Sequence, residues 1–437
     1  MSRDTLQAQA DAPLSESLAT TVVVSRKAPI AFAVITALSA LLYVLAPHDA
    51  QVTYRLSGGN DVIQLPELVV PGLSVAWGGV VLLAVATAWA FVLVGRRRPV
   101  PLWLTIVFAV VALVAFLTWA AAGASTPVIP VPGLLAGSLS LSVPLIYGAL
   151  CGVISERVGV VNIAIEGQLL AGAFASAVVA SLVGQALLGQ TLGIIAAAAA
   201  GVLVSFVLAA FSIKYFVDQI IVGVVLNVLV IGLTSFLFSQ VLAPNAQLLN
   251  QPPRLERIPI PLLADIPIIG PTFFRQTIIV YLMYLAVALV YVGLFHTRWG
   301  LRLRSVGEHP QAADTVGINV TGTRFWNVSL AGAIAGIGGA FFTLGSVGSF
   351  NKEMTAGMGF IALAAVIFGK WDPIRATLAA LLFGFASNLQ NTLGVIGSPV
   401  PSEFMLMLPY VVTIFAVAGL VGRSRPPAAS GKPYITS

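Results

Sequence analysis

Long apolar runs, separated by short polar segments, fill this chain from residue 28 almost to its end. Most of the runs have about the 20 residues that a helix needs to cross the hydrocarbon core of a membrane. The pattern predicts an all-α polytopic membrane protein with about twelve transmembrane helices. The expected spans are residues 28–46, 73–94, 102–122, 136–153, 160–184, 189–213, 219–241, 277–296, 326–346, 357–369, 376–396 and 404–421.

One of these runs, residues 357–369, is too short for an ordinary span, and it follows the glycine-rich polar stretch GSVGSFNKEMTAGMG. We expect a short or re-entrant helix there. Irregular backbone at membrane depth persists only where protein or a water-filled cavity satisfies its polar groups, so the stretch is a candidate pathway lining. Asp372 and Pro373 then predict the cap and the first residue of the next helix.

The composition supports a membrane location. Hydrophobic residues make up 58% of the chain and charged residues only 9%, and the mean hydropathy is +0.98. The net charge of +6 comes from small basic clusters at the edges of apolar runs, which fits membrane topology better than nucleic-acid binding. A cytosolic amino terminus places these clusters in the cytosol, so we expect both termini there, with residues 1–27 as a disordered tail and residues 423–437 as a second tail.

The polar island at residues 297–320 is predicted to meet another protein on the cytosolic side. Arg302 and Arg304 lie in it, and positive loops beside spans are retained in the cytoplasm. Pro310 suits the first position of a helix and Gly317 its end, so a short helix is expected near residues 308–317. Small side chains would let it seat in a groove of a partner, with hydrogen bonds at its margin. The alternative is an ordinary solvated loop. The other residues that we assign to this surface are Glu308, His309, Ala312, Ala313 and Asp314.

Several polar residues lie within the apolar runs, where polarity is costly and often functional. Asn162 and Glu166 are four residues apart and are predicted to share one helical face. Glu166 should point inward, either toward substrate or as a structural acceptor that is protonated or paired with Arg157. Asn227, Asn327 and Asn388 could line a pathway or form interhelical hydrogen bonds. Gly332, Gly336, Gly338 and Gly339 predict close helix packing.

Other chemistry has little support. The single Cys151 excludes an intrachain disulfide, and the three histidines are too scattered to predict a metal site. No phosphate-binding loop occurs, because Gly369-Lys370 runs into Trp371 and Gly431-Lys432 into Pro433. The prolines of the segment 243–276 predict a stiff, non-helical outer loop.

Four segments resemble the permease subunits of ABC importers for branched-chain amino acids, ribose and nucleosides. They are SERVGVVNIAIEGQLLAGAF at 155–174, GLRLRSVGEHPQAADTVGINV at 300–320, AGAIAGIGGAF through NKEMTAGMGFIALAAVIFGKWDP at 331–373, and LPYVVTIFAVAGL at 408–420. The N-I-x-x-E-G element, here Asn162, Ile163, Glu166 and Gly167, is similar to the nucleoside and simple-sugar branch.

The resemblance implies a type II importer in a bacterial cytoplasmic membrane, with residues 28–135 as accessory spans and residues 136–422 as the permease core. The implied partners are a cytosolic ABC ATPase, which holds ATP and Mg, a second permease that is a different relative, and an extracytoplasmic substrate-binding lipoprotein. The chain itself would have no catalytic residue, cofactor or metal, and it would bind lipid but no nucleic acid. The helix near 308–317 would be the coupling helix. The expected substrate pathway comprises Asn162, Glu166, Asn227, Phe350, Asn351 and Asn388.

Two other classes remain open. An ion-coupled secondary transporter of a small polar solute would also have twelve spans and an intramembrane carboxylate, but it would need no ATPase. An intramembrane enzyme would need His, Asp or Glu clustered near one membrane face, and this chain has only scattered ones.

Overall fold

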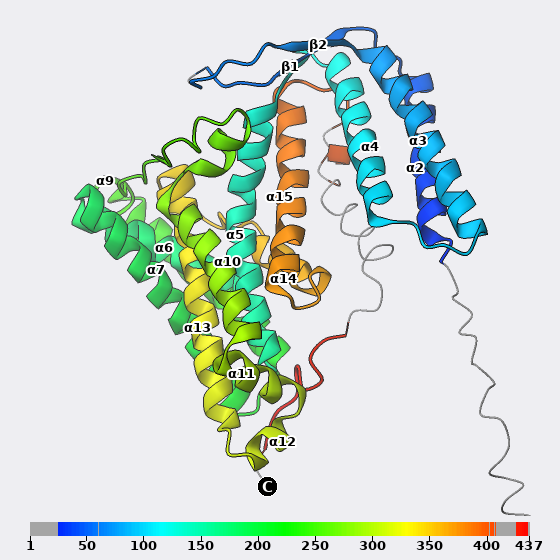
Figure 1. The fold of residues 1–437 in the computed structure, drawn as a ribbon. Coiled ribbons are helices and arrows are strands. Elements are labelled where there is room, and N and C mark those ends of the chain that lie inside the picture. The colour runs from blue at the N-terminus through cyan, green and yellow to red at the C-terminus, as the bar shows by residue number, and fades with distance from the viewer. Residues whose placement is uncertain (1–24, 60, 402, 406, 408–424, 436–437) are drawn as a thin grey trace, which may run out of the picture. The chain divides into compact units, whose positions relative to one another are not determined.

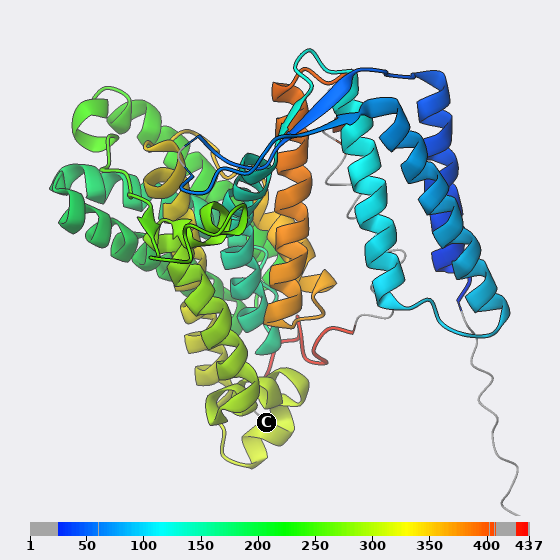
Figure 2. The ribbon, with the colours of Figure 1, turned by 45° about the horizontal axis from the view of Figure 1, so that its top comes forward.

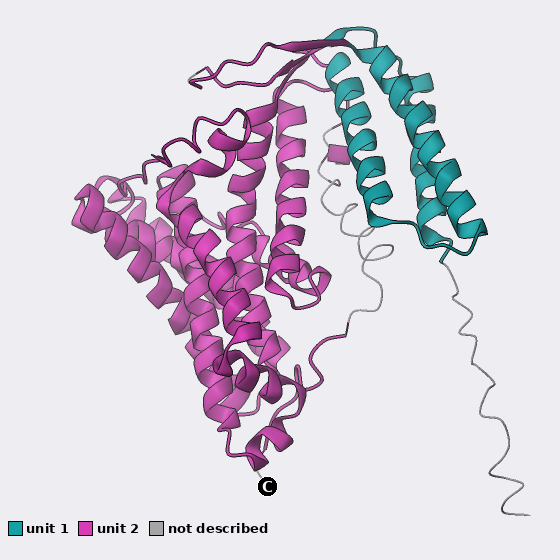
Figure 3. Cartoon of the chain, in the orientation of Figure 1, with its two compact units in different colours: residues 1–51, 71–123 teal, residues 52–70, 124–437 magenta. Residues whose placement is uncertain are grey.

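A computed structural model of the chain describes residues 25–435, except residues 60, 402, 406 and 408–424. The described chain is mostly helical (Figure 1). It divides into two compact units (Figure 3). Unit 1 comprises residues 1–51 and 71–123, and unit 2 comprises residues 52–70 and 124–437.

Unit 1 is a bundle of long apolar helices. In it, the Phe32 ring stacks on the Phe108 ring with centroids 3.9 Å apart, and the Thr36 and Thr87 hydroxyls share a hydrogen bond of 3.1 Å. The outer faces stay exposed and apolar, as expected of surfaces that meet lipid. Its helices are α2 (Lys27–Leu45), α3 (Gly72–Gly95) and α4 (Leu102–Ala122).

In unit 2, α6, α7 and α13 pack on one another, and α5 packs on α13 and α15 (Figures 1 and 2). Three of its helices continue into π-helical turns, named η1, η2 and η4. The helical segments of unit 2 are α5 (Val131–Arg157), α6 (Ile165–Val183), α7 (Ala186–Ala209), η1 (Ala210–Lys214), α8 (Gln219–Leu237), η2 (Phe238–Leu242), α9 (Ala246–Leu249), η3 (Gly270–Phe274), α10 (Ile278–His296), α11 (Arg298–Glu308), α12 (Pro310–Thr315), α13 (Val320–Ala340), η4 (Phe341–Val347), α14 (Met358–Phe368) and α15 (Pro373–Val395).

The structure confirms the fold class. Within the described residues, nine helices are long and apolar enough to cross a membrane, and α14 is the short helix expected at 357–369. α15 lies at the expected span 376–396, and Asp372 caps it by accepting a hydrogen bond from the Arg375 N–H at 2.9 Å. The expected span 404–421 lies largely outside the described residues.

Short strands connect the helices at several places. β1 (Gln51–Arg55) pairs in parallel with β3 (Val128–Pro130), with Thr53 opposite Val128, in a sheet of order β2-β1-β3. The remaining strands are β2 (Leu68–Pro71), β4 (Ile258–Pro259) and β5 (Arg275–Gln276), and β4 pairs antiparallel to β5.

The segment 243–276 is largely non-helical as predicted, with two short exceptions, α9 and η3. Pro271 lies in the first turn of η3, where a missing N–H breaks no intrahelical hydrogen bond.

The predicted close packing through the α13 glycines is confirmed. A Cβ on Gly336 would collide with the Ala197 carbonyl of α7, and a Cβ on Gly172 of α6 would collide with the Gly336 carbonyl. A Cβ on Gly339 would likewise meet the backbone of α6. The three backbones therefore approach one another at positions where only glycine fits, as in other membrane helix pairs with small residues at the contact.

Replacing Gly336 by valine is expected to destabilise unit 2 by about 1–3 kcal/mol, because the side chain must push α7 away from α13. Thermal unfolding of the detergent-purified protein measures this loss. Gly232→Val in α8 is the matched control, since a Cβ there meets nothing within 4 Å. An equal loss in both variants, or no loss at Gly336, would contradict the close helix contact.

Candidate functional site

The first backbone N–H groups of a helix need partners, and in α14 a buried carboxylate provides them. The Glu166 carboxylate accepts hydrogen bonds from the Gly357 and Gly359 N–H groups at 2.8 and 2.6 Å. The Thr355 hydroxyl donates to the same carboxylate at 2.6 Å. Glu166 is only 3% exposed, so it points inward as predicted. One buried acid therefore caps the short helix.

The local sequence explains this arrangement. Glu166 lies in the first turn of α6, so the amino-terminal ends of α6 and α14 meet at one anion, which both helix dipoles favour. Gly357 has φ +81°, which lets its N–H turn toward the carboxylate, and a Cβ on Gly359 would collide with Glu166. The alternative pairing of Glu166 with Arg157 is wrong, because the Arg157 Nε donates to the Trp371 carbonyl at 2.9 Å.

The prediction that Asn162 and Glu166 share a helical face is also wrong. α6 begins at Ile165, and Asn162 lies in the loop that leads to it. Gly159, with φ +94°, turns the chain there, and the β-branched residues beside it favour extended backbone. The sequence does not show this break, because the residues of the loop are as apolar as those of the helix that follows.

Asn162 instead belongs to a buried polar network. It exchanges hydrogen bonds with the Gln168 side chain at 3.2 Å in both directions, and its Nδ2 donates to the Cys151 Sγ at 3.2 Å. Gln168 also donates to the Ser205 hydroxyl of α7 at 2.8 Å. The sequence does offer one signal for Gln168, which is a polar residue within an apolar run.

Asn227 of α8 joins the same region from the other side. Its Oδ1 accepts from the Gly167 N–H and its Nδ2 donates to the Ile163 carbonyl, both at 2.8 Å. Asn227 thus holds both ends of the turn that carries Glu166. Three of the expected pathway residues, Asn162, Glu166 and Asn227, are therefore brought together at the start of α6.

The other expected pathway residues lie apart from this group. Phe350 is fully buried and packs edge-to-face on the Phe174 ring, 5.2 Å between centroids. Asn351 is exposed, and Asn388 of α15 donates to the Leu134 carbonyl of α5 at 2.7 Å. Asn388 thus forms an interhelical hydrogen bond. Within the described residues, no group of three or more His, Cys, Asp or Glu is arranged to hold a metal ion.

The second region is the α11–α12 end of unit 2 (Figures 1 and 2). α12 is the predicted short helix, with Pro310 in its first turn, and Gly317 follows it with φ +82°. α11 was missed, because its arginines were attributed to a loop rather than to a helix with one buried face, formed by Leu303 and Val306.

The expected docking residues differ in exposure. Ala313 is 3% exposed and packs into the core of this chain. It therefore holds α12 against unit 2 and does not face a partner. The Arg304 guanidinium lies 5.1 Å from the centroid of the Phe295 ring of α10. The residues that stay exposed are Arg302, Glu308, His309, Ala312, Asp314 and Gly317.

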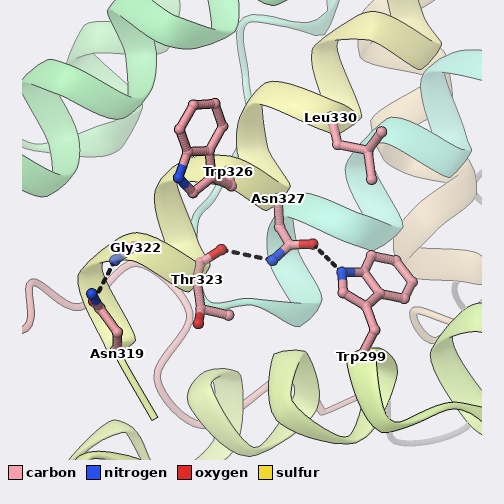
Figure 4. Close-up of a pocket in the computed structure, with 7 residues that line it drawn as sticks. All are labelled: Trp299, Asn319, Gly322, Thr323, Trp326, Asn327 and Leu330. Carbon is pink, nitrogen blue, oxygen red and sulfur yellow. Dashed lines mark hydrogen bonds between the residues drawn. The ribbon is translucent and has the colours of Figure 1, made fainter.

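An open pocket of about 440 Å³ lies between α11 and the first turns of α13 (Figure 4). The Trp299 Nε1 donates to the Asn327 Oδ1 at 2.9 Å, and the Asn327 Nδ2 donates to the Thr323 carbonyl at 2.7 Å. Asn327 therefore forms an interhelical hydrogen bond, one of its two expected roles. The pocket is lined by Trp299, Asn319, Gly322, Thr323, Trp326, Asn327 and Leu330.

These features define a multi-pass membrane protein with a broken helix at a buried polar centre. The chain belongs to the family described as the branched-chain amino acid transport system permease component, which matches residues 134–417. The resemblance found in the sequence is thus confirmed, and α2, α3 and α4 precede the matched region.

Individual relatives cover the same part of the chain. The guanosine ABC transporter permease protein NupQ of Bacillus subtilis is 43% identical over 308 residues, 68% of this chain and 95% of NupQ. The nucleoside ABC transporter permease protein NupC of Lactococcus lactis is 43% identical over 310 residues, 70% of this chain and 97% of NupC. The putative glucose ABC transporter permease protein TsgC13 of Haloferax volcanii is 33% identical over 258 residues, 59% of this chain and 77% of TsgC13. No solved structure gives a significant match.

Replacing Glu166 by glutamine is expected to destabilise the protein by about 1–3 kcal/mol, because an amide NH₂ would face backbone N–H donors that now meet a carboxylate oxygen. Thermal unfolding measures the loss, and faster hydrogen exchange at residues 357–361 locates it. The control is Glu353→Gln, a change of the same kind at an exposed position of the preceding loop. Unchanged stability and exchange in Glu166→Gln would show that the carboxylate does not hold α14.

Proposed function

We propose that this chain is the membrane-spanning permease of an ATP-driven ABC importer for nucleosides. The observation that carries the proposal is the 43% identity to permeases named for guanosine and nucleosides, along 95% and 97% of their lengths. The short exposed helix α12 supports the ATP-driven part, because it offers a compact protein-docking surface outside the apolar bundle.

In this proposal, partner proteins bind ATP and deliver the substrate. A cytosolic ABC ATPase binds ATP and Mg and docks on α12, an extracytoplasmic lipoprotein delivers the substrate, and a second, related permease completes the pathway. The α11–α12 end of unit 2 then faces the cytosol, as do both termini, in a bacterial cytoplasmic membrane. The basic side chains Arg302 and Arg304 near α12 agree with this orientation.

The buried polar residues at the start of α6 fix the position of the proposed pathway. Of the expected pathway residues, we keep Asn162, Glu166 and Asn227, which hold the turn between α5 and α6, and the exposed Asn351. Phe350 packs in the core and Asn388 is bonded to α5, so these two serve as supports of the bundle. A broken helix capped by a carboxylate can move with that turn as one body, since hydrogen bonds join the two. ATP binding to the partner shifts the equilibrium between outward-facing and inward-facing arrangements of the bundle, because the ATPase binds one arrangement more tightly.

A charge on α12 is expected to block docking. In Ala312→Glu, an acidic side chain replaces a small exposed one in the middle of α12, so ATPase co-purification and ATP-dependent uptake should fall at least about tenfold, the effect of one uncompensated buried charge at an interface. Both are measured on complexes assembled from all subunits.

The matched control is Ala243→Glu, which makes the same change at an exposed position between η2 and α9. This variant should retain both the ATPase and the uptake. Normal co-purification with Ala312→Glu would exclude α12 as the docking helix.

The substrate class is tested by competition. Uptake of radiolabelled guanosine into proteoliposomes that hold the assembled importer should be blocked by unlabelled nucleosides and left unchanged by ribose or leucine at equal concentration. Inhibition by ribose or leucine alone would place the chain in another branch of the family.

A further inference from the structure

The carboxyl-terminal segment, residues 425–435, lies against the α11–α12 end of unit 2 (Figure 1). The Ala428 N–H donates to the Glu308 carboxylate at 3.2 Å, and the Ala429 N–H donates to the Gly307 carbonyl at 2.9 Å. Ala429 is 4% exposed. The segment is therefore packed against the end of α11 and is not a free tail.

The same segment reaches α12. The Tyr434 hydroxyl donates to the Asp314 carboxylate at 2.7 Å, and its ring packs against the main core. This hydrogen bond raises the pKa of Tyr434 above its ordinary value, since the neutral phenol is the donor. α12 has only six residues, too few to be stable without tertiary contacts, so this hydrogen bond helps to fix its position.

The segment also contacts two elements that lead into the membrane. The Gly431 N–H donates to the Gly159 carbonyl at 3.3 Å, in the turn between α5 and α6. The Arg324 Nη1 of α13 donates to the Lys432 carbonyl at 2.9 Å. Arg324 is 2% exposed with the segment in place, and among the described residues its Nε and Nη2 have no partner, so the Lys432 carbonyl is an important acceptor for this buried guanidinium.

We infer that residues 425–435 clamp the docking helix α12 to α13 and to the α5–α6 turn, so that a displacement of α12 is transmitted to the turn that carries Asn162 and Glu166. The inference rests on the proposed docking of an ATPase at α12. Tyr434 is a positioning residue in this arrangement. It touches neither substrate nor ATP, and it acts through Asp314.

The test separates docking from transmission in the fully assembled importer. Tyr434→Phe keeps the ring and removes the hydroxyl, so the ATPase should still co-purify and hydrolyse ATP. The number of nucleosides taken up per ATP should fall roughly threefold to tenfold, the factor that corresponds to an ordinary hydrogen bond. Tyr215→Phe is the control, because this exposed tyrosine keeps its ring contacts with Phe211 and Lys214.

A double-variant experiment tests whether Tyr434 acts through its hydrogen bond to Asp314. Asp314→Ala should lower the uptake per ATP as Tyr434→Phe does, and the double variant should be no worse than either single one. Additive losses in the double variant would show that the two side chains act separately and would overturn the clamp.

Removal of residues 425–437 tests the whole segment. We expect a larger loss of uptake per ATP, with the ATPase still bound. Unchanged uptake per ATP would overturn the clamp, and increased uptake would make the segment an inhibitory strap instead. Loss of the ATPase in Tyr434→Phe would make the segment part of the docking surface, again overturning the clamp. Failure of the proposed function looks different, because uptake by the unmodified importer would then not depend on ATP.

Discussion

The structure of unit 2 depends on one requirement, that polar groups buried in an apolar bundle must find partners inside the protein. Where α14 begins, the Glu166 carboxylate meets that requirement with three hydrogen bonds. Asn227 and Gln168 meet it for the turn that precedes α6, through hydrogen bonds to Ile163, Gly167 and Asn162. Since these contacts join segments far apart in the sequence, the broken helix and the α5–α6 turn are held as one unit.

The glycine contacts make this centre possible. α6, α7 and α13 approach so closely at Gly172, Gly336 and Gly339 that side chains from α6 and α7, such as Gln168 and Ser205, reach each other directly. Close backbone contact and buried hydrogen bonding thus reinforce each other: neither the polar network nor the helix crossing would form at wider spacing. The permease core thus combines the close packing of α6, α7 and α13 with the short helix α14, which hydrogen bonds attach to α6.

Some of this could be read from the sequence. Hydropathy identified the long apolar helices, Pro310 and Gly317 marked α12, and Asp372 with Pro373 marked the start of α15, because each of these signals is local. The break before α6 was missed, because an apolar loop and an apolar helix have the same hydropathy. The contacts of the carboxyl-terminal segment were also missed, since Asp314 and Tyr434 are separated by 120 positions and no local pattern links them. The proposed roles of the pathway residues concern partner proteins and a substrate, which the sequence of one chain does not encode.

The central claim is that transport through this chain is driven by ATP on a partner. The most direct test measures guanosine uptake into proteoliposomes that contain the permeases and the binding protein, prepared with or without the ATPase. Each preparation receives ATP inside the vesicle, ATP outside the vesicle, or an imposed proton gradient. The account predicts uptake only when the ATPase is present and ATP is on its side of the membrane. Uptake that follows the proton gradient without the ATPase would contradict it and would make the chain an ion-coupled carrier.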